Sequence, residues 1–438
     1  MDVSTVPHVA TLPEDQEIVD GCSCGTEPGA LAGDLTRRRL LTGLGAMGAL
    51  AVGEAAAPRL AFAAGAPAKS DLIVSVFLRG AMDGLSAVVP YADPEYYAAR
   101  PGIRILAKAV HRLDASFGLH PVLKPMLNSW HRGDLAVVHA VGSPHPTRSH
   151  FDAQDFMERG VPGDTTVSTG WLGRHLASRP SRSSLRAIAV GGNVQLSLRG
   201  PVPAIALKRI SDFSLVAEDA ERTVLETTLE RLYSGLAHQM GGAGVSTVGA
   251  ARRLRALART TYHPAGGAKY PTSELGRQLA EVARLAKARV GLEAACVDAN
   301  GWDTHEAMGT HSSGRMTVLL ADLGQALGAF YTDLAGLRGV TVVVMSEFGR
   351  RVAENGSGGT DHGHGGVMFV MGAGIRGHRV YGRWPGLAPH RLDRGDLAVT
   401  TDYRDVLGEV LMARGGGTSM ASVFPRHAVR PLGLADPR

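Results

Sequence analysis

A short glycine-rich segment late in the chain contains the residue types most typical of metal chemistry. It reads Asp361-His362-Gly363-His364-Gly365-Gly366. Glycines on both sides let the backbone bring two imidazoles to one centre, and imidazole is a common ligand of Zn²⁺. A flexible loop in solvent is the lesser alternative for the same pattern. The segment therefore predicts that His362 and His364 are metal ligands.

Further carboxylates and imidazoles stand in other short polar segments of the chain. A mixture of oxygen and nitrogen ligands binds Zn, Mn, Mg or Ca, and two metals could share the carboxylates. Such a centre could activate a bound water or clamp a phosphoryl oxygen during hydrolysis of an anionic ester. The additional predicted ligands are Asp83, Asp303, His305 and Glu347.

Each of these four residues also has a structural explanation. Asp83 precedes a glycine and could make a turn, and Asp303 or Thr304 could cap a helix. Glu347 stands between apolar neighbours, where an unpaired carboxylate would be costly, and Arg350 could neutralise it.

Ser149 is the predicted catalytic nucleophile, with Thr147 in reserve. Ser149 precedes a helical pattern, with Asp152 three residues later, so it could equally be a helix N-cap. The two roles are compatible, because a helix N-terminus also attracts the anion that the hydroxyl would attack. Arg148 and Arg350 lie beside these positions and could bind the phosphate or sulfate group in a bidentate manner.

Apolar runs precede most of these polar segments and are typical of buried strands. They predict a mostly parallel, doubly wound α/β sheet, in which ligands gather outside the carboxyl ends of the strands. The runs span residues 72–78, 135–141, 292–297, 340–345 and 367–371.

Helical patterns complete this picture. Residues 316–334 place leucines and aromatics on one face, and the strand at 340–345 follows, as in a βαβ unit. Between about 212 and 290 the pattern indicates helices, which we interpret as a helical insertion. Residues 191–207 before it are typical of short strands or a hairpin.

The first 63 residues have the character of a twin-arginine export leader. Arg37-Arg38-Arg39 is followed by an uncharged run, 40–53, that is too short and too glycine-rich to span a membrane. Ala61-Phe62-Ala63 offers a signal peptidase site. We expect the twin-arginine (Tat) translocon to export a folded protein of residues 64–438, with no stable membrane span in its mature form. It would act outside the cytoplasm, in the periplasm, at the cell wall or beyond, and an uncleaved anchor is the alternative.

Charge and cysteine content narrow the function classes. Removing the leader would raise the formal net charge from +5 to about +9, but the basic residues are dispersed and form no run typical of nucleic-acid or membrane binding. We therefore expect no nucleic-acid partner. Cys22 and Cys24 fall in the leader, which leaves Cys296 alone, so the mature chain could form no internal disulfide.

Several longer runs resemble a bacterial family catalogued as domain of unknown function 1501. They cover nearly the whole mature chain and include FLRGAMDGLSAVVPYADPEYYAARPGI, SHFDAQDFMERG, GWDTHEAMGTH, VVVMSEFGRRVAENGSGGTDHGHGGVMFVMGAGIRG and TTDYRDVLGEVL. The resemblance implies a twin-arginine leader and membership of the alkaline phosphatase and sulfatase superfamily, which uses a two-metal site on a doubly wound sheet. The order of Asp83, Ser149, Asp303, His305, Glu347, His362 and His364 matches that superfamily's order of ligands and nucleophile.

Two positions depart from the superfamily pattern. Its phosphatases typically have an Asp-His pair where this chain has Glu347-Phe348, and a longer spacing after the position of Asp303. One metal could thus be bound differently or be absent.

The resulting hypothesis is an exported hydrolase of a phosphate or sulfate ester, on a small molecule or a polymer, with one or two divalent metals. The alternatives are a binding or assembly protein of the same fold, acting on cell-surface polymer, and a metal hydrolase that forms no serine intermediate.

Overall fold

The computed structural model describes residues 71–437, except for 180, 182, 184, 213–218, 235–237, 335–338 and 415–417. The predicted export leader, residues 1–63, lies outside the described residues. Among the described helices, none is long and apolar enough to cross a membrane.

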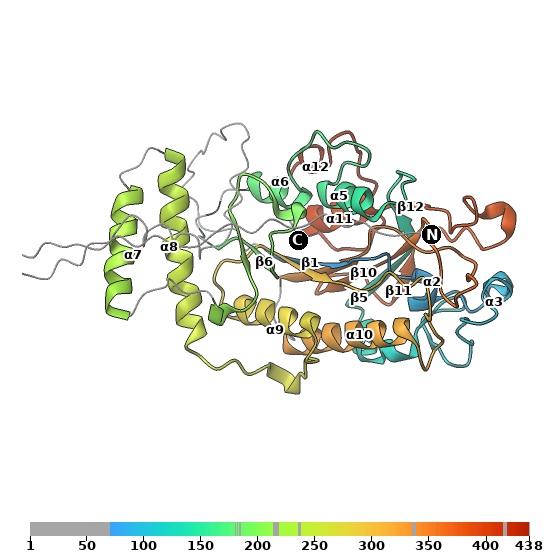
Figure 1. Ribbon diagram of the computed structural model, residues 1–438. Helices are drawn as coiled ribbons and strands as arrows, with labels where there is room; N and C mark the ends of the chain where they lie inside the picture. Colours follow the sequence, from blue (N-terminus) through green and yellow to red (C-terminus); the bar gives the residue numbers. More distant parts are fainter. Residues whose placement is uncertain are drawn as a thin grey trace, which may run out of the picture. The chain divides into compact units, whose positions relative to one another are not determined.

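A nine-stranded mixed sheet forms the centre of the described chain (Figure 1). The strand order is β11-β5-β10-β9-β1-β8-β6-β7, and β12 pairs with β5. All pairs are parallel except those of β10 with β5 and β9. The strands are β1 (Leu72–Leu78), β5 (Leu135–Gly142), β6 (Ala187–Val190), β7 (Ala204–Leu207), β8 (Ala294–Ala299), β9 (Val340–Met345), β10 (Gly366–Gly372), β11 (Arg379–Tyr381) and β12 (Thr401–Asp402).

The prediction of an α/β fold with a mostly parallel sheet is confirmed. The apolar runs at 72–78 and 340–345 are strands β1 and β9 with the predicted bounds, whereas β8 begins and ends two residues later than predicted. Residues 191–207 were predicted as short strands or a hairpin. They contain the short strand β7, but the hairpin is wrong, because β7 pairs in parallel with β6. Strand β10 runs antiparallel to β9, and residues 346–365 connect the two strands.

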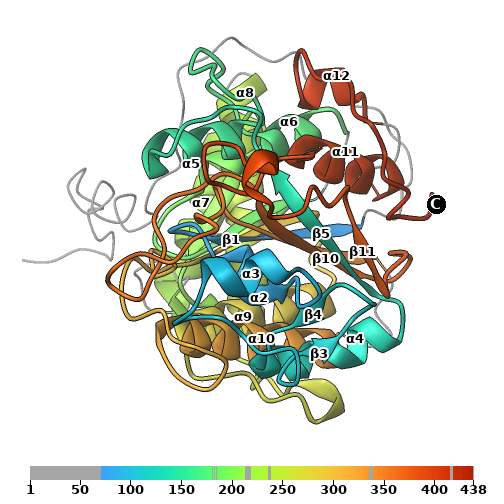
Figure 2. The same ribbon diagram turned by 90° about the vertical axis from the view of Figure 1, so that its right-hand side faces the viewer.

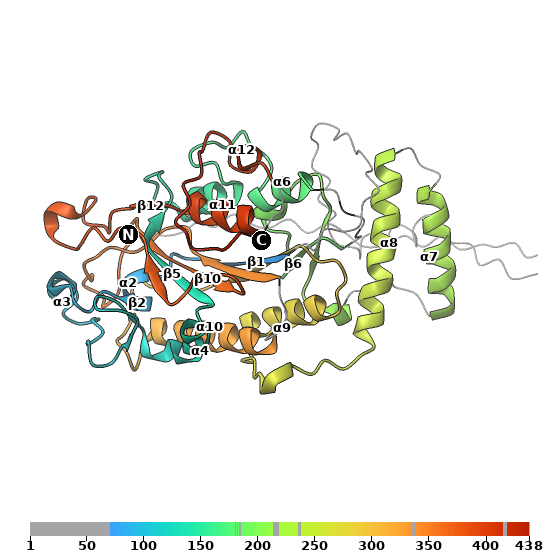
Figure 3. The same ribbon diagram turned by 180° about the vertical axis from the view of Figure 1, so that it is seen from behind.

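Helices cover both faces of the sheet, as Figures 1 and 3 show from opposite sides. Helices α9 and α10 lie on one face, and α5, α6 and α11 lie on the other. The helices are α2 (Gly84–Ala87), α3 (Pro94–Ala99), α4 (Leu127–His131), α5 (His150–Arg159), α6 (Trp171–Ala177), α7 (Asp219–Ser234), α8 (His238–Ala258), α9 (Glu274–Lys287), α10 (Arg315–Asp333), α11 (Tyr403–Arg414) and α12 (Met420–Val423).

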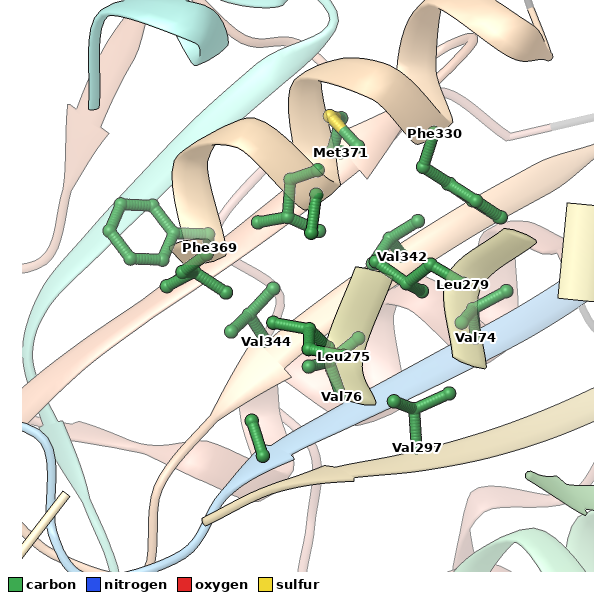
Figure 4. Packing of buried hydrophobic residues seen from close by; sticks show 14 of the residues in the cluster. Val74, Val76, Leu275, Leu279, Val297, Phe330, Val342, Val344, Phe369 and Met371 are labelled. Carbon is green, nitrogen blue, oxygen red and sulfur yellow. The ribbon is translucent and has the colours of Figure 1, made fainter. Parts of the chain in front are cut away.

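Strand β1 is buried on both faces, which explains its continuous apolar sequence. Successive side chains of a strand point to opposite faces. Val74 and Val76 accordingly pack toward α9 and α10 (Figure 4), whereas Ile73 and Phe77 pack with the residues of α6 and α11. The two-sided core fixes the register of β1 and thereby the position of the loop that follows it.

The helical segment at 212–290 contains α7, α8 and α9. Helices α7 and α8 pack on each other, and α8 reaches the main core through Ala250 and Leu254. Helix α9 covers the sheet directly, because Leu275, Leu279 and Val282 belong to that core. Part of the expected insertion is thus a covering helix of the sheet.

A small second sheet lies beside the carboxyl end of β1. Strands β2 (Val88–Val89), β4 (Gly118–Leu119) and β3 (His111–Arg112) form it, and α2 and α3 lie close by in Figure 2. The segments after β1, β5, β8 and β9 leave the main sheet at the same edge, since these four strands run in one direction. Side chains from distant parts of the sequence can therefore meet there.

Candidate metal centre

Three imidazoles and one carboxylate converge at this edge of the sheet. His150 is the first residue of α5, which follows β5; Asp303 and His305 follow β8; and His362 follows β9. The Nε2 atom of His362 lies 2.9 Å from Nε2 of His150 and 2.9 Å from Nε2 of His305. Asp303 Oδ1 lies 3.0 Å from His305 Nε2 and 3.5 Å from the Nε2 atoms of His150 and His362.

The outward-facing nitrogens of these imidazoles have acceptors. His150 Nδ1 lies 2.7 Å from Glu347 Oε1, and His362 Nδ1 lies 2.9 Å from the carbonyl oxygen of Arg148. His305 Nδ1 lies 3.3 Å from Asp361 Oδ1. A proton on each Nδ1 satisfies these contacts and leaves the lone pair of each neutral ring on Nε2, facing the centre.

This arrangement favours a positive charge at the centre, and Nη1 of Arg350 already lies 3.4 Å from Nε2 of His305. Two Nε2 lone pairs that face each other at 2.9 Å repel unless a proton or a cation lies between them. Four ligands at about 2.0–2.1 Å from one ion would lie about 3.3 Å apart. The five distances given above, which do not include the one between His150 and His305, are 2.9–3.5 Å. The ligand atoms of His150, Asp303 and His362 all lie within 4.8 Å of one another. The donor set fits a single divalent cation.

Asp303 and His305 keep the centre open to solvent. Their side chains are 46% and 43% exposed, whereas that of His150 is 21% exposed. Although partial burial acts against it, the hydrogen bond and charge of Arg350 hold the pKa of Asp303 below its ordinary value. Asp303 is therefore an anion at neutral pH, as a cation ligand must be.

Glu347 lies behind His150 and not among the converging atoms. It is fully buried, and its Oε1 also accepts hydrogen bonds from the backbone N–H of Gly80 at 2.8 Å and from Gln154 at 2.9 Å. Burial opposes ionisation, but the hydrogen bonds from His150 and Gln154 keep the pKa of Glu347 below its ordinary value. In return, the hydrogen bond to Glu347 raises the pKa of His150. Glu347, which was predicted as a ligand, thus orients the imidazole of His150.

Arg350 is buried beside Asp303 and contacts its Oδ1. The same guanidinium donates to the carbonyl oxygens of Ala81 at 2.8 Å and of Thr360 at 3.1 Å. Most of its donors are therefore occupied. Arg350 neutralises Asp303, and little of it remains for an incoming anion.

The structure places Asp83 in a separate ion pair. Asp83 and Arg100 are both fully buried, with contacts of 2.9 Å and 2.8 Å between the carboxylate and the guanidinium. Asp83 also accepts from the backbone N–H of Ser86 at 2.7 Å as the N-cap of α2. The expected turn-forming role of this residue is thus present, and its oxygens are committed to these partners.

His364 also lies outside the converging group. Its Nδ1 contacts Asp393 at 2.9 Å and its Nε2 contacts the carbonyl oxygen of Ser143 at 2.9 Å, so both ring nitrogens have partners. Gly363 separates the two histidines, and a side chain there would meet the backbone of Arg350 at 2.3 Å. This close approach explains the glycine between the histidines.

Ser149 is the N-cap of α5, as its sequence context predicts. Its side chain accepts from the backbone N–H of Asp152 at 3.4 Å, and it directly precedes His150. Arg148 forms an ion pair with the buried Asp396, while its carbonyl oxygen contacts His362. The segment 147–150 is therefore tied to the cluster by its backbone.

His150 was not predicted as a ligand from the sequence. The residue directly follows Ser149, and of these two residues only Ser149, through its hydroxyl, was given a catalytic role in the prediction. Its position just beyond a buried strand is the same signal that singled out Asp303 and His305.

A hydrogen-bonded chain continues behind the cluster. Gln154 connects Glu347 to Arg79, with 3.0 Å between Gln154 Oε1 and Arg79 Nη1. Arg79 in turn pairs with Glu158 at 2.8 Å and Asp298 at 2.9 Å. This network holds α5 against the ends of β1 and β8.

The family model described as "Protein of unknown function (DUF1501)" matches residues 70–437. The chain belongs to the DUF1501 family. The match covers every converging residue of the cluster. A search of the curated proteins gives no match.

Proposed function

We propose that this DUF1501 protein is a metal-dependent hydrolase of a phosphate or sulfate ester. The observation that carries the proposal is the convergence of three Nε2 atoms and Asp303 Oδ1 on one point, each imidazole oriented from behind. A divalent cation held by these four residues would supply Lewis-acid chemistry, which activates water and stabilises charge on an ester oxygen.

The N-terminus of α5 supports an anionic ester as the substrate. The ten-residue helix begins at His150, within the cluster, and its first backbone N–H groups and dipole favour a negatively charged group. Ser149 precedes this turn and is partly exposed, so its hydroxyl is the candidate nucleophile. Buried Arg350 keeps Asp303 ionised without competing for the substrate.

The resemblance to the alkaline phosphatase and sulfatase superfamily remains part of this proposal. The mixed sheet and the order of the cluster residues along the chain are compatible with it. One departure follows from the geometry: Asp83 and His364 have other partners, so the proposal is for one metal and not two.

Metal analysis combined with an activity assay tests the proposal. Purified full-length protein, loaded in turn with Zn²⁺, Mn²⁺, Mg²⁺ and Ca²⁺, is expected to retain about one equivalent of one of them and to hydrolyse 4-nitrophenyl phosphate or sulfate. His305→Ala and His362→Ala should lose both properties, and the exposed His131→Ala is the matched control. A wild-type protein that retains none of these metals would overturn the metal centre. Metal retention without turnover would overturn the hydrolase and favour a binding protein.

We also propose that the protein is exported through the twin-arginine translocon. The support is Arg37-Arg38-Arg39 followed by an uncharged run and a small-residue cleavage site. Replacing all three arginines by lysine should leave the protein in the cytoplasmic fraction with its leader attached. Unchanged export of that variant would contradict this route.

A further inference from the structure

A polar cavity shares two chain segments with the proposed metal centre, although none of the four cluster residues lines it. Its volume is about 770 Å³, within the range of about 300–1,000 Å³ that is typical of small-molecule sites. His364 and Asp393 form part of its wall, Pro144 after β5 adds to it, and residues 398–402, which lead into and form β12, supply more of it.

Two chain segments lead from the ligands of the centre to this cavity. His364 lines the cavity and lies two residues after His362. The Cα atoms of these two residues can be at most about 7 Å apart. Pro144 also lines it, and the segment from Pro144 leads to His150. Arg148, two residues before His150, pairs with Asp396, which lies two residues before Ala398 of the cavity wall. One extended molecule could therefore reach both.

The charged groups of the cavity wall have local partners, which are arginine or aspartate in two contacts and histidine in two. Asp402 pairs with Arg404 at 2.6 Å, and Asp405 contacts His427 at 2.8 Å. Asp393 contacts His364, as described above, and Arg426 pairs with Asp164. A ligand of high charge would disrupt these pairs, whereas their remaining lone pairs and N–H groups are available to neutral hydroxyls.

Arg430 adds an exposed donor to this wall. Within the described part of the chain its guanidinium forms no ion pair. Ala398, Val399 and Ala428 supply small apolar surfaces between the polar groups. Closely spaced donors and acceptors with intervening apolar patches complement a ring that has hydroxyls on its edge and C–H groups on its faces.

We propose that this cavity binds the uncharged, hydroxyl-rich alcohol part of the substrate, such as a sugar ring. The inference rests on the proposed function, because it assigns the metal centre to the ester group and the cavity to the alcohol. The substrate class is then a phosphate or sulfate ester of a carbohydrate. Aryl esters occupy the centre alone.

Binding of sugars without an ester group tests the cavity independently of hydrolysis. Full-length protein is titrated with neutral methyl glycosides, and binding is followed by saturation-transfer NMR. At least one glycoside should bind saturably. Arg430→Ala removes a donor from the cavity wall, and Ala398→Trp fills space in the cavity. Each should raise the Kd of that glycoside about ten-fold or more. Arg199→Ala, an exposed arginine outside the cavity wall, is the matched control.

The metal-site variant His305→Ala separates the two proposals. It should bind the glycoside as the wild type does, because His305 does not line the cavity. With the metal ligands intact, Arg430→Ala should lower kcat/KM for a sugar sulfate or phosphate. The ratio of this value to kcat/KM for the 4-nitrophenyl ester should fall about ten-fold from its wild-type value. Absence of saturable glycoside binding, binding unchanged by both cavity variants, or tighter binding of glucuronate than of neutral glycosides would overturn the inference. Glycoside binding without hydrolysis of any ester would overturn the proposed function alone.

Discussion

Glu347 determines how His150 presents its lone pair. The carboxylate is buried and holds Nδ1 of His150 at 2.7 Å, so its charge and position both act on the ligand. Groups that orient metal-binding histidines commonly contribute about 10–100-fold to metal affinity. The contribution of Glu347 can be measured without removing any ligand.

Glu347→Gln should weaken metal binding about 10–100-fold while the protein still folds, because the amide keeps an acceptor near His150 but loses the charge. Isothermal titration with Zn²⁺ measures the change. The matched control is Glu354→Gln, whose carboxylate accepts from the backbone N–H groups of Gly102 and Ile103. Equal affinities of Glu347→Gln and wild type would show that Glu347 has no orienting role.

Ser149 has two candidate roles that substitution can separate. Ser149→Ala should cost about 1 kcal/mol of stability through the lost N-cap of α5 and, if the hydroxyl is the nucleophile, lower kcat by a factor of about 10³ or more. Thermal unfolding and turnover of 4-nitrophenyl phosphate or sulfate are measured together. Ser149→Thr keeps both a cap and a hydroxyl and should restore much of each. Full activity of the alanine variant would leave the attack to water.

The predicted and observed sites differ in which group each buried carboxylate contacts. Asp83 and Glu347 were expected to bind metal because each follows a predicted buried strand, at the end of the sheet where ligands gather. The partner of Asp83, however, is Arg100, which lies at the end of a short helix and carries no signal of its own in the sequence. Which of several available cations a carboxylate meets depends on tertiary packing.

At the scale of elements, the long apolar segments were predictable. Strands β1 and β9 are continuous apolar runs because helices cover both faces of the sheet, and periodicity alone detects them. Strand β6 is only four residues long and was not predicted. The antiparallel direction of β10 also lies beyond a local pattern, because an apolar strand reads the same in either direction.

Helix α10 provides a direct test of the core that positions the loops. Leu320 is fully buried against the sheet, whereas Val318 on the same helix is 68% exposed. Leu320→Ala should lower the free energy of unfolding by about 2–5 kcal/mol, and Val318→Ala by less than about 0.5 kcal/mol. Chemical denaturation measures both. A similar loss for the two variants would contradict the observed packing of α10.

At the scale of the whole molecule, three buried histidines make stability depend on pH. Burial lowers the pKa of His120, His139 and His175 to about 4 in each case. In the unfolded chain they titrate near a pKa of about 6.5. Above about pH 6.5 they are neutral in both states and contribute nothing to the pH dependence. As the pH falls from about 6.5 to 4, only the unfolded state takes up these protons, so stability is lost in that window.

The free energy of unfolding should therefore decrease as the pH falls from about 6.5 to 4. Its slope against pH should correspond to the uptake of up to about three protons on unfolding. Denaturation at a series of pH values in the presence of a chelator measures the slope without a contribution from metal binding. His139→Gln should reduce the slope by about one proton. A free energy that stays constant over this window would contradict the neutral, buried state of these side chains.

The central claim is that one cation occupies the point where His150, His305, His362 and Asp303 converge. Anomalous diffraction from crystals of the metal-loaded protein tests it most directly. We predict a single strong anomalous peak about 2.0–2.2 Å from the three Nε2 atoms and from Asp303 Oδ1. A peak at Asp83 or His364, or no peak in crystals that contain the metal, would contradict it.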